Sequence, residues 1–173
     1  MGSNKLLLES GGRPLVRRVV DAAAEAGCTP VVVVVRDGQT ASAAGPAASL
    51  VFNPDADAGM SSSIRVGLQA LPPQCEATVI LLADQPLVSA DTIRTLISAA
   101  AGLSTPAAAA RFERLATWTP PVYVRRSLWE TFMQLEGDHG AREVFVAQPE
   151  LLSVVDVPGS PLDIDTPEDA AKL

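Results

Sequence analysis

Acidic side chains follow an apolar segment of this sequence and are the first candidates for chemistry. Asp84 comes directly after TVILLA (residues 78–83), and Pro86 stands two positions further on. A proline there stiffens the turn and restricts the preceding residue to extended conformations. A carboxylate at the carboxyl end of a buried strand is well placed to hold a divalent cation. The alternative is that Asp84 only accepts backbone hydrogen bonds in a turn.

A second acidic pair, Asp163 and Asp165, precedes a Thr-Pro helix start near the end of the sequence. The two residues are two positions apart, so in an extended segment both side chains point to the same side. One interpretation is that Asp165 joins Asp84 on one Mg²⁺, because magnesium needs few protein carboxylates when substrate phosphates supply the other ligands. The other interpretation is ordinary capping of the helix that follows.

Two glycine-containing segments could bind anions. GMSSSI (59–64) places a glycine and three serines at an expected helix start, where free backbone amides can hold an anion or the polar edge of a base. GDHGAR (137–142) leads into a later helix and offers Arg142 as a cation. A plain N-cap and a solvated arginine are the alternative interpretations. His139 is expected to be exposed, because nothing near it completes a catalytic constellation.

The elements that must position these residues alternate between strands and helices, which predicts an α/β fold with a mostly parallel sheet. Strands are expected at 31–35, 49–52, 78–83, 107–112, 121–124 and 151–157, and helices at 13–27, 59–71, 89–100, 127–135 and 166–173. The valine run 31–35 is expected to be buried on both faces. Ser89 is expected to cap its helix, Ser127 and Glu130 form a capping-box pattern, and 40–48 reads as a surface loop.

Composition narrows the class of protein. The 173 residues are 47% hydrophobic, which predicts a single domain over 1–173 with a real core. A net charge of −7 argues against a nucleic-acid-binding surface. Because no apolar run is long enough to cross a bilayer and no secretory signal pattern is visible, no membrane partner is expected. The two cysteines lack metal-site spacing, so reduced thiols and a cytoplasmic location are expected.

Together, NPDADAGMSSSIRVGL, LLADQPLVSADTI, GDHGAR and LDIDTPEDAAKL resemble the motifs of the MobA-like nucleotidyltransferases, most closely the molybdenum cofactor cytidylyltransferase branch. The resemblance implies a three-layer Rossmann-like fold that binds a nucleoside triphosphate and Mg²⁺. A substrate phosphate then attacks the α-phosphate, and pyrophosphate leaves. CTP and molybdopterin are the favoured substrates, with a molybdoenzyme or maturation factor as a further partner. GTP as donor, another phosphorylated acceptor, and a non-catalytic nucleotide-binding relative are the alternatives.

The resemblance also implies roles for individual residues. Lys5 and Asp84 are similar to the family's catalytic lysine and metal-binding aspartate, and Asp165 resembles the second acidic position of the metal site. The implied nucleotide-binding residues are Lys5, Asn53, Gly59, Met60, Ser63 and Asp84. The implied acceptor-side residues are Gly137, Asp138 and Arg142.

The sequence departs from the family pattern at its start. Family members open with a buried strand and a Gly-rich loop, roughly LAAGxSxRMGxxK, whereas this sequence begins at MGSNK, the tail of that signature. The strand would lie between 31–35 and 78–83, so its absence predicts two unpaired edges facing a gap of roughly 10 Å. We therefore expect Met1 to be an internal methionine of a longer gene product, and these 173 residues alone to be poorly stable and nearly inactive. At 119–121, TPP stands where family members often carry Gly-His-Pro, which leaves the acceptor less defined than the reaction.

Overall fold

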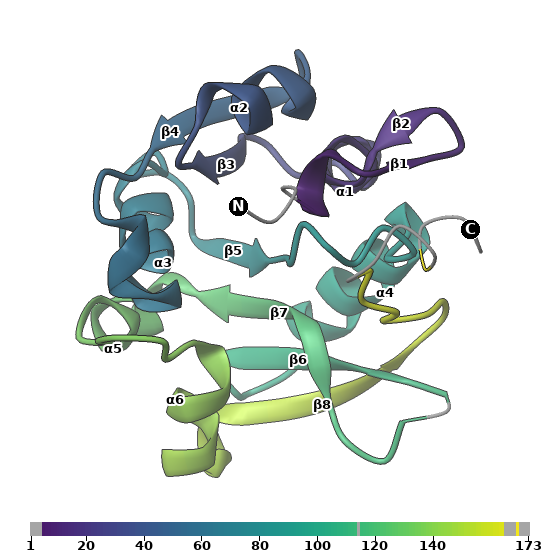
Figure 1. Ribbon diagram of the computed structural model, residues 1–173. Helices are drawn as coiled ribbons and strands as arrows, with labels where there is room; N and C mark the ends of the chain where they lie inside the picture. The colour runs from purple at the N-terminus through teal and green to yellow at the C-terminus, as the bar shows by residue number, and fades with distance from the viewer. Residues whose placement is uncertain (1–4, 114, 165–168, 170–173) are drawn as a thin grey trace.

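The computed structural model describes residues 5–113, 115–164 and 169, and it consists of strands enclosed by helices (Figure 1). The strands are β1 (Glu9–Ser10), β2 (Arg13–Pro14), β3 (Val31–Val35), β4 (Ala48–Phe52), β5 (Ala77–Ile80), β6 (Ala107–Phe112), β7 (Thr119–Arg125) and β8 (Leu152–Val157). The α-helices are α1 (Leu15–Glu25), α2 (Gly38–Ala44), α3 (Met60–Gln69), α4 (Ala90–Ala101), α5 (Trp129–Met133) and α6 (Ala141–Ala147). Short 3-10 helices are η1 (Lys5–Leu7), η2 (Ala56–Ala58), η3 (Arg126–Leu128) and η4 (Pro149–Leu151).

The strands form one four-stranded sheet and two pairs. The larger sheet has the order β5–β7–β6–β8, in which β7 runs antiparallel to both of its neighbours and β6 runs parallel to β8. Strands β3 and β4 form a parallel pair of their own, and β1 and β2 a short hairpin. The predicted α/β fold is confirmed.

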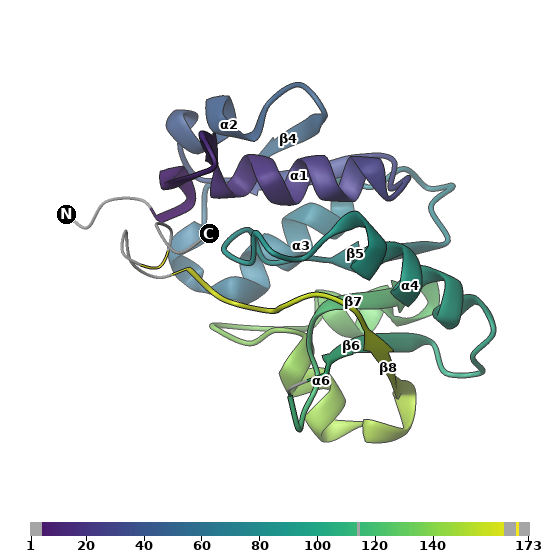
Figure 2. The same ribbon diagram turned by 90° about the vertical axis from the view of Figure 1, so that its right-hand side faces the viewer.

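Helices cover both faces of the four-stranded sheet, because successive side chains of a strand point to opposite faces. Ala107 and Ala109 of β6 pack in a cluster with residues of α3, α5 and α6. Ala108 and Ala110 pack in a second cluster with residues of α1 and α4. Figure 2 shows β5, β7 and β6 one below another in the order of the sheet, with α1 above β5. The expected three layers are therefore present.

Strands β3 and β5 lie on either side of a cavity, and no described strand lies between them. Among the residues that the structure describes, β3 pairs only with β4, and β5 pairs only with β7. A cavity of about 850 Å³ lies between them and is lined by residues of both strands. This confirms the prediction that the sheet is interrupted between these two strands.

Strands β3 and β5 both differ from expectation, each for its own reason. The valine run was expected to be buried on both faces, but only Val35 is fully buried, because the open edge of β3 leaves its other valines partly exposed. Strand β5 was expected to reach residue 83 but ends at Ile80, which pairs with Val122. Beyond Val122 the partner strand continues into Pro121, which has no N–H to donate, so the ladder stops there.

Residues 40–48 do not form only a loop, because α2 occupies Gly38–Ala44. Asp37 caps this helix by accepting a hydrogen bond from the backbone N–H of Thr40 at 2.7 Å. Ala44 is completely buried against Val16 and Val20. The cap and the tertiary packing together form a helix where the composition alone indicated a loop.

The capping box predicted at Ser127 and Glu130 is wrong. Helix α5 begins at Trp129 without a side-chain cap, and Ser127 lies inside η3. The backbone N–H of Arg126 donates to the carbonyl of Glu76 at 2.7 Å, so the chain enters a tight turn directly from β7. The helix therefore starts two residues later than the local pattern indicates.

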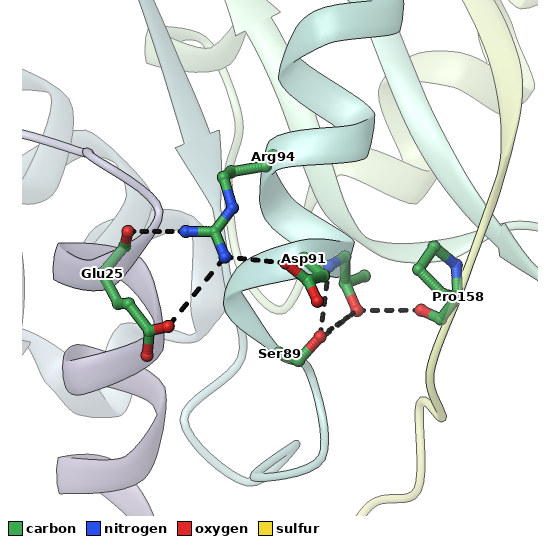
Figure 3. A network of polar contacts seen from close by, with 6 residues as sticks. Glu25, Ser89, Asp91, Arg94 and Pro158 are labelled. Carbon is green, nitrogen blue, oxygen red and sulfur yellow. Dashed lines mark hydrogen bonds and ion pairs between the residues drawn. The ribbon is translucent and has the colours of Figure 1, made fainter.

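Helix α4 is held at its start by a polar network that Figure 3 shows. As predicted, Ser89 caps the helix, accepting a hydrogen bond from the backbone N–H of Thr92 at 3.2 Å. The Thr92 hydroxyl donates to the carbonyl of Pro158 at 2.8 Å. Arg94 donates to the carbonyl of Glu25 in α1 at 2.8 Å. The network ties α4 to α1 and to the segment after β8.

In the described part of the chain, no helix has both the length and the apolar character needed to span a bilayer.

Candidate functional site

Lys5 and Asp84 meet at the point where the chain leaves β5. The Lys5 ammonium in η1 lies 2.7 Å from Asp84 Oδ2, and the two side chains are 40% and 20% exposed. A partly exposed ion pair of this kind contributes at most about 1 kcal/mol to stability. Its charges therefore matter more for what they can bind than for holding the fold together. The structure thus brings together the two residues that the resemblance implies as catalytic.

The segment around Asp163 docks beside this pair. The backbone N–H of Ile164 donates to the carbonyl of Asp84 at 3.0 Å, and Gln85 Nε2 donates to Asp163 Oδ1 at 2.9 Å. Ile164 anchors the segment because it is completely buried against Leu15. Asp165 lies outside the described residues, so its role as a metal ligand stays a prediction.

Gln85 is a site residue that reasoning from the sequence missed. It is 2% exposed, and within the described ranges its Oε1 has no hydrogen-bond donor. A buried amide needs partners for both its oxygen and its nitrogen. The signal was present in the sequence, since a glutamine between an aspartate and a proline after a buried strand cannot easily reach solvent. Gln85 positions Asp163 next to the Lys5–Asp84 pair.

Asn53 directly follows β4, and its side chain holds the first turn of α3 in place through hydrogen bonds. The side chain is 2% exposed, and its Nδ2 donates to the hydroxyls of Ser62 and Ser63 at 2.9 and 3.1 Å. Its Oδ1 accepts from the backbone N–H of Asp55 at 3.0 Å. Two residues of the implied nucleotide-binding set, Asn53 and Ser63, are therefore in direct contact.

The GMSSSI and GDHGAR segments contact each other through their glycines. Gly59 has a φ of +98°, and a Cβ added there would fall 2.4 Å from the carbonyl oxygen of Gly137, so only glycine fits. The backbone N–H of Ser61 donates to Gly137 O at 3.2 Å, and that of Met60 donates to Asp138 Oδ1 at 3.3 Å. Gly59 and Met60, implied for the nucleotide, thus contact Gly137 and Asp138, implied for the acceptor side.

Within GDHGAR, residues 137–139 and Arg142 are exposed, whereas Gly140 and Ala141 are buried. The backbone N–H of Gly140 donates to Glu143 Oε2 at 2.7 Å, and this hydrogen bond lowers the pKa of the Glu143 carboxyl. The nearby charges of His139 and Arg142 lower that pKa further. Arg142 is exposed and borders the cavity between β3 and β5. His139 is exposed, as expected.

The donor atoms at this site suit a hard divalent cation. Asp84 and the neighbouring Asp163 offer carboxylate oxygens, which magnesium and manganese prefer, and no thiol or imidazole joins them in the contacts described. The described residues contain no cluster of three or more His, Cys, Asp or Glu that could hold a metal by itself. A cation here would need ligands from a bound phosphate, and that requirement fits a nucleotide site.

The fold and the site define the class of protein. The crystal structure of Rv0371c from Mycobacterium tuberculosis H37Rv superimposes with a TM-score of 0.82 at 25% identity, over 99% of this chain and 88% of that chain. Its complex with manganese gives a TM-score of 0.78 at 24% identity, over 99% and 91% of the two chains. CMP:2-keto-3-deoxy-manno-octonic acid synthetase complexed with CTP shares the fold, with a TM-score of 0.71 at 17% identity over 97% and 89%. The chain has the Rossmann-like nucleotidyltransferase fold.

The family follows from the sequence comparison. The family model of the MobA-like NTP transferase domain matches residues 1–151, so the chain belongs to this family of nucleotidyltransferases. Purine catabolism protein PucB from Bacillus subtilis (strain 168) is 32% identical over 120 residues, which are 66% of this chain and 56% of PucB. The match therefore spans little more than half of that relative's length.

Proposed function

We propose that this chain transfers a nucleoside monophosphate from a nucleoside triphosphate to a phosphorylated small-molecule acceptor and releases pyrophosphate. The observation that carries the proposal is the Lys5–Asp84 ion pair of 2.7 Å at the end of β5, beside the docked Asp163 segment. CTP is the proposed donor, because the motifs resemble the cytidylyltransferase branch and a neighbour of the same fold was solved with CTP. Molybdopterin is the proposed acceptor, on the motif resemblance alone.

The chain's own residues would act mainly by position and charge. An acceptor phosphate oxygen forms a bond to the α-phosphorus while the bond to the departing pyrophosphate breaks, so negative charge shifts onto phosphate oxygens. The Lys5 ammonium can neutralise part of that charge. The Gly59–Gly137 contact and the Asn53–Ser63 hydrogen bond hold the helix start against which the nucleotide base would lie.

Asp84 would hold the Mg²⁺ together with Asp163 or Asp165. A bound magnesium ion would supply further neutralisation of the phosphate charge and help to orient the triphosphate. A manganese complex of a neighbour with the same fold supports a divalent cation, and the oxygen-only donor set extends the proposal to magnesium.

The test incubates the protein with molybdopterin and each of the four nucleoside triphosphates in turn. Pyrophosphate release is measured in Mg²⁺ and in Mn²⁺. We expect CTP to be preferred and Asp84→Asn to lower kcat/KM by about 10²–10³, the range for losing one transition-state stabilising contact. Asp91→Asn is the matched control, because Asp91 is an exposed carboxylate that pairs with Arg94 on α4. Equal use of all four triphosphates, or equal activity of the two variants, would contradict the proposal.

A second candidate function is nucleotide binding without catalysis. The specific observation in its favour is the cavity between β3 and β5, which opens beside Ser63 and Arg142 where a nucleotide would need firm support. Isothermal titration with CTP, with and without Mg²⁺, separates the two candidates when combined with the turnover assay. Metal-dependent binding without pyrophosphate release would favour the second candidate.

A further inference from the structure

We propose that Lys5 competes with the divalent cation for Asp84, and that a bound triphosphate releases Asp84 by drawing the Lys5 ammonium to its own oxygens. The cation and the nucleotide therefore bind cooperatively, each raising the affinity of the other. The inference rests on the proposed function, because it takes a phosphate-bearing substrate as the group that removes the lysine. It gives Lys5 a second role, which precedes the chemical step.

The competition follows from the position of the ammonium on the carboxylate. Lys5 Nζ lies 2.7 Å from Asp84 Oδ2, a distance typical of a charge-assisted hydrogen bond. A divalent cation would have to ligate the same oxygen or its neighbour Oδ1, and magnesium requires its oxygen ligands at about 2.0–2.1 Å. Either position brings a doubly charged ion close to the ammonium, and like charges repel. The ion pair and metal ligation by Asp84 are therefore alternative states.

The second carboxylate near this pair is also engaged by the protein. Asp163 Oδ1 accepts a hydrogen bond from Gln85 Nε2 at 2.9 Å. Gln85 is 2% exposed, so it holds this oxygen from inside the fold. Among the residues with described positions, no cluster of three or more His, Cys, Asp or Glu could hold a metal. Without phosphate oxygens, a cation that displaced Lys5 would therefore gain few protein ligands.

Packing holds the backbone of Lys5 beside Asp84 and leaves the side chain able to move. Leu6 and Ala83, the chain neighbours of these two residues, pack against the same buried cluster, which joins α1 to α2. The backbone N–H of Leu8 donates to the Lys5 carbonyl at 3.1 Å. The Lys5 side chain is 40% exposed and carries its ammonium on a flexible stem. The ammonium can therefore move from the carboxylate to a phosphate without rearrangement of the fold.

A triphosphate reverses the preference of both groups. It carries several negative charges, so the Lys5 ammonium gains more from phosphate oxygens than from a single carboxylate. Asp84 is then released to ligate a divalent cation, and phosphate oxygens supply the ligands that the protein lacks. Because linkage is reciprocal, the cation raises the affinity for the triphosphate by the same factor as the triphosphate raises the affinity for the cation.

The test compares the wild-type chain with Lys5→Met, which keeps an unbranched side chain and removes the charge. Electron paramagnetic resonance measures Mn²⁺ binding without nucleotide, and we expect Lys5→Met to bind Mn²⁺ roughly tenfold more tightly than wild type. Isothermal titration in EDTA measures CTP binding without metal, and the same variant should bind CTP roughly threefold more weakly, since the phosphates lose a cation. A variant that was only misfolded would bind both ligands more weakly.

Two controls separate the competition from a general effect of charge. Arg111 pairs with Asp156 at 2.7 Å and is 44% exposed, which matches the distance and exposure of Lys5. Arg111→Met therefore releases a carboxylate outside the site, and should change Mn²⁺ affinity by less than about twofold. In the double variant Lys5→Met, Asp84→Asn, the gain in Mn²⁺ affinity should be lost, because the gain requires the Asp84 carboxylate.

Unchanged or weaker Mn²⁺ binding by Lys5→Met would overturn the proposal, and so would an equal gain from Arg111→Met. Because a partly exposed ion pair contributes little to stability, Lys5→Met is expected to fold. Lys5→Gln is a second neutral variant that must show the same gain.

The Mn²⁺ measurement needs neither acceptor nor turnover, so it fails separately from the proposed function. Tighter Mn²⁺ binding by Lys5→Met without pyrophosphate release from wild type would support the competition and contradict the proposed function. Turnover by wild type with unchanged Mn²⁺ binding by Lys5→Met would contradict the competition alone.

Discussion

Gly59 is the position where one added methyl group tests the contact between the two glycine-containing loops. Its φ of +98° and ψ of 179° lie in a region that is essentially restricted to glycine, where another residue costs about 1–3 kcal/mol. An added Cβ would also fall 2.4 Å from both the carbonyl carbon and oxygen of Gly137, so the two backbones must separate. Separation removes the hydrogen bonds from Ser61 and Met60, at about 1 kcal/mol each. Gly59→Ala should therefore destabilise the protein by about 3–5 kcal/mol.

Gly45→Ala is the matched control for this change. Gly45 has a φ of +81° and a ψ of −179°, so the backbone strain is nearly the same. The nearest atoms to its added Cβ belong to the Arg17 side chain, which can move aside. We expect a loss of about 1–3 kcal/mol for this variant.

Urea unfolding measures the difference between the two variants in the free energy of unfolding. Each kcal/mol shifts Tm by about 2–4 °C at this chain length. We therefore expect the Tm of Gly59→Ala to lie about 4–8 °C below that of Gly45→Ala. Losses that agree within about 0.5 kcal/mol, the usual spread for neutral surface changes, would show that the loop contact contributes nothing and would refute the reasoning.

Three further predictions concern contacts within the fold. Asn53→Ala leaves two serine hydroxyls without their buried donor and should cost about 2–3 kcal/mol in urea unfolding. Ser89→Ala removes the cap of α4 and should cost about 1 kcal/mol, whereas Ser42→Ala at an exposed position should stay within about 0.5 kcal/mol. Arg111, which is hydrogen-bonded to Asp156, lowers the pKa of that carboxyl, so the pair stabilises the fold above the carboxyl's unfolded pKa and loses this effect as pH falls through the folded one. Arg111→Met should raise the pKa of Asp156 in an NMR titration and reduce the acid-side loss of stability; an unchanged pKa would contradict the assignment.

Local patterns in the sequence located most of the elements that carry the site. The cap at Ser89, the glycine–serine helix start at 59–64 and the acidic turn after 78–83 are each contained within a few consecutive residues. The interruption between β3 and β5 could also be predicted, because the family pattern places a strand between them that these 173 residues do not contain. Local patterns failed at 40–48 and at Ser127, where tertiary packing and a strand-to-turn hydrogen bond decided the structure.

The sequence by itself therefore determined which residue types stand at strand ends and helix starts, since caps, turns and hydrophobic periods are short-range features. Only the tertiary structure decided that Lys5 meets Asp84, that Gly59 touches Gly137, and that buried Gln85 holds Asp163. The last of these hydrogen bonds joins residues 78 positions apart. Contacts at such separations depend on how whole elements pack. They produce no periodic pattern in the sequence, so they cannot be predicted from it.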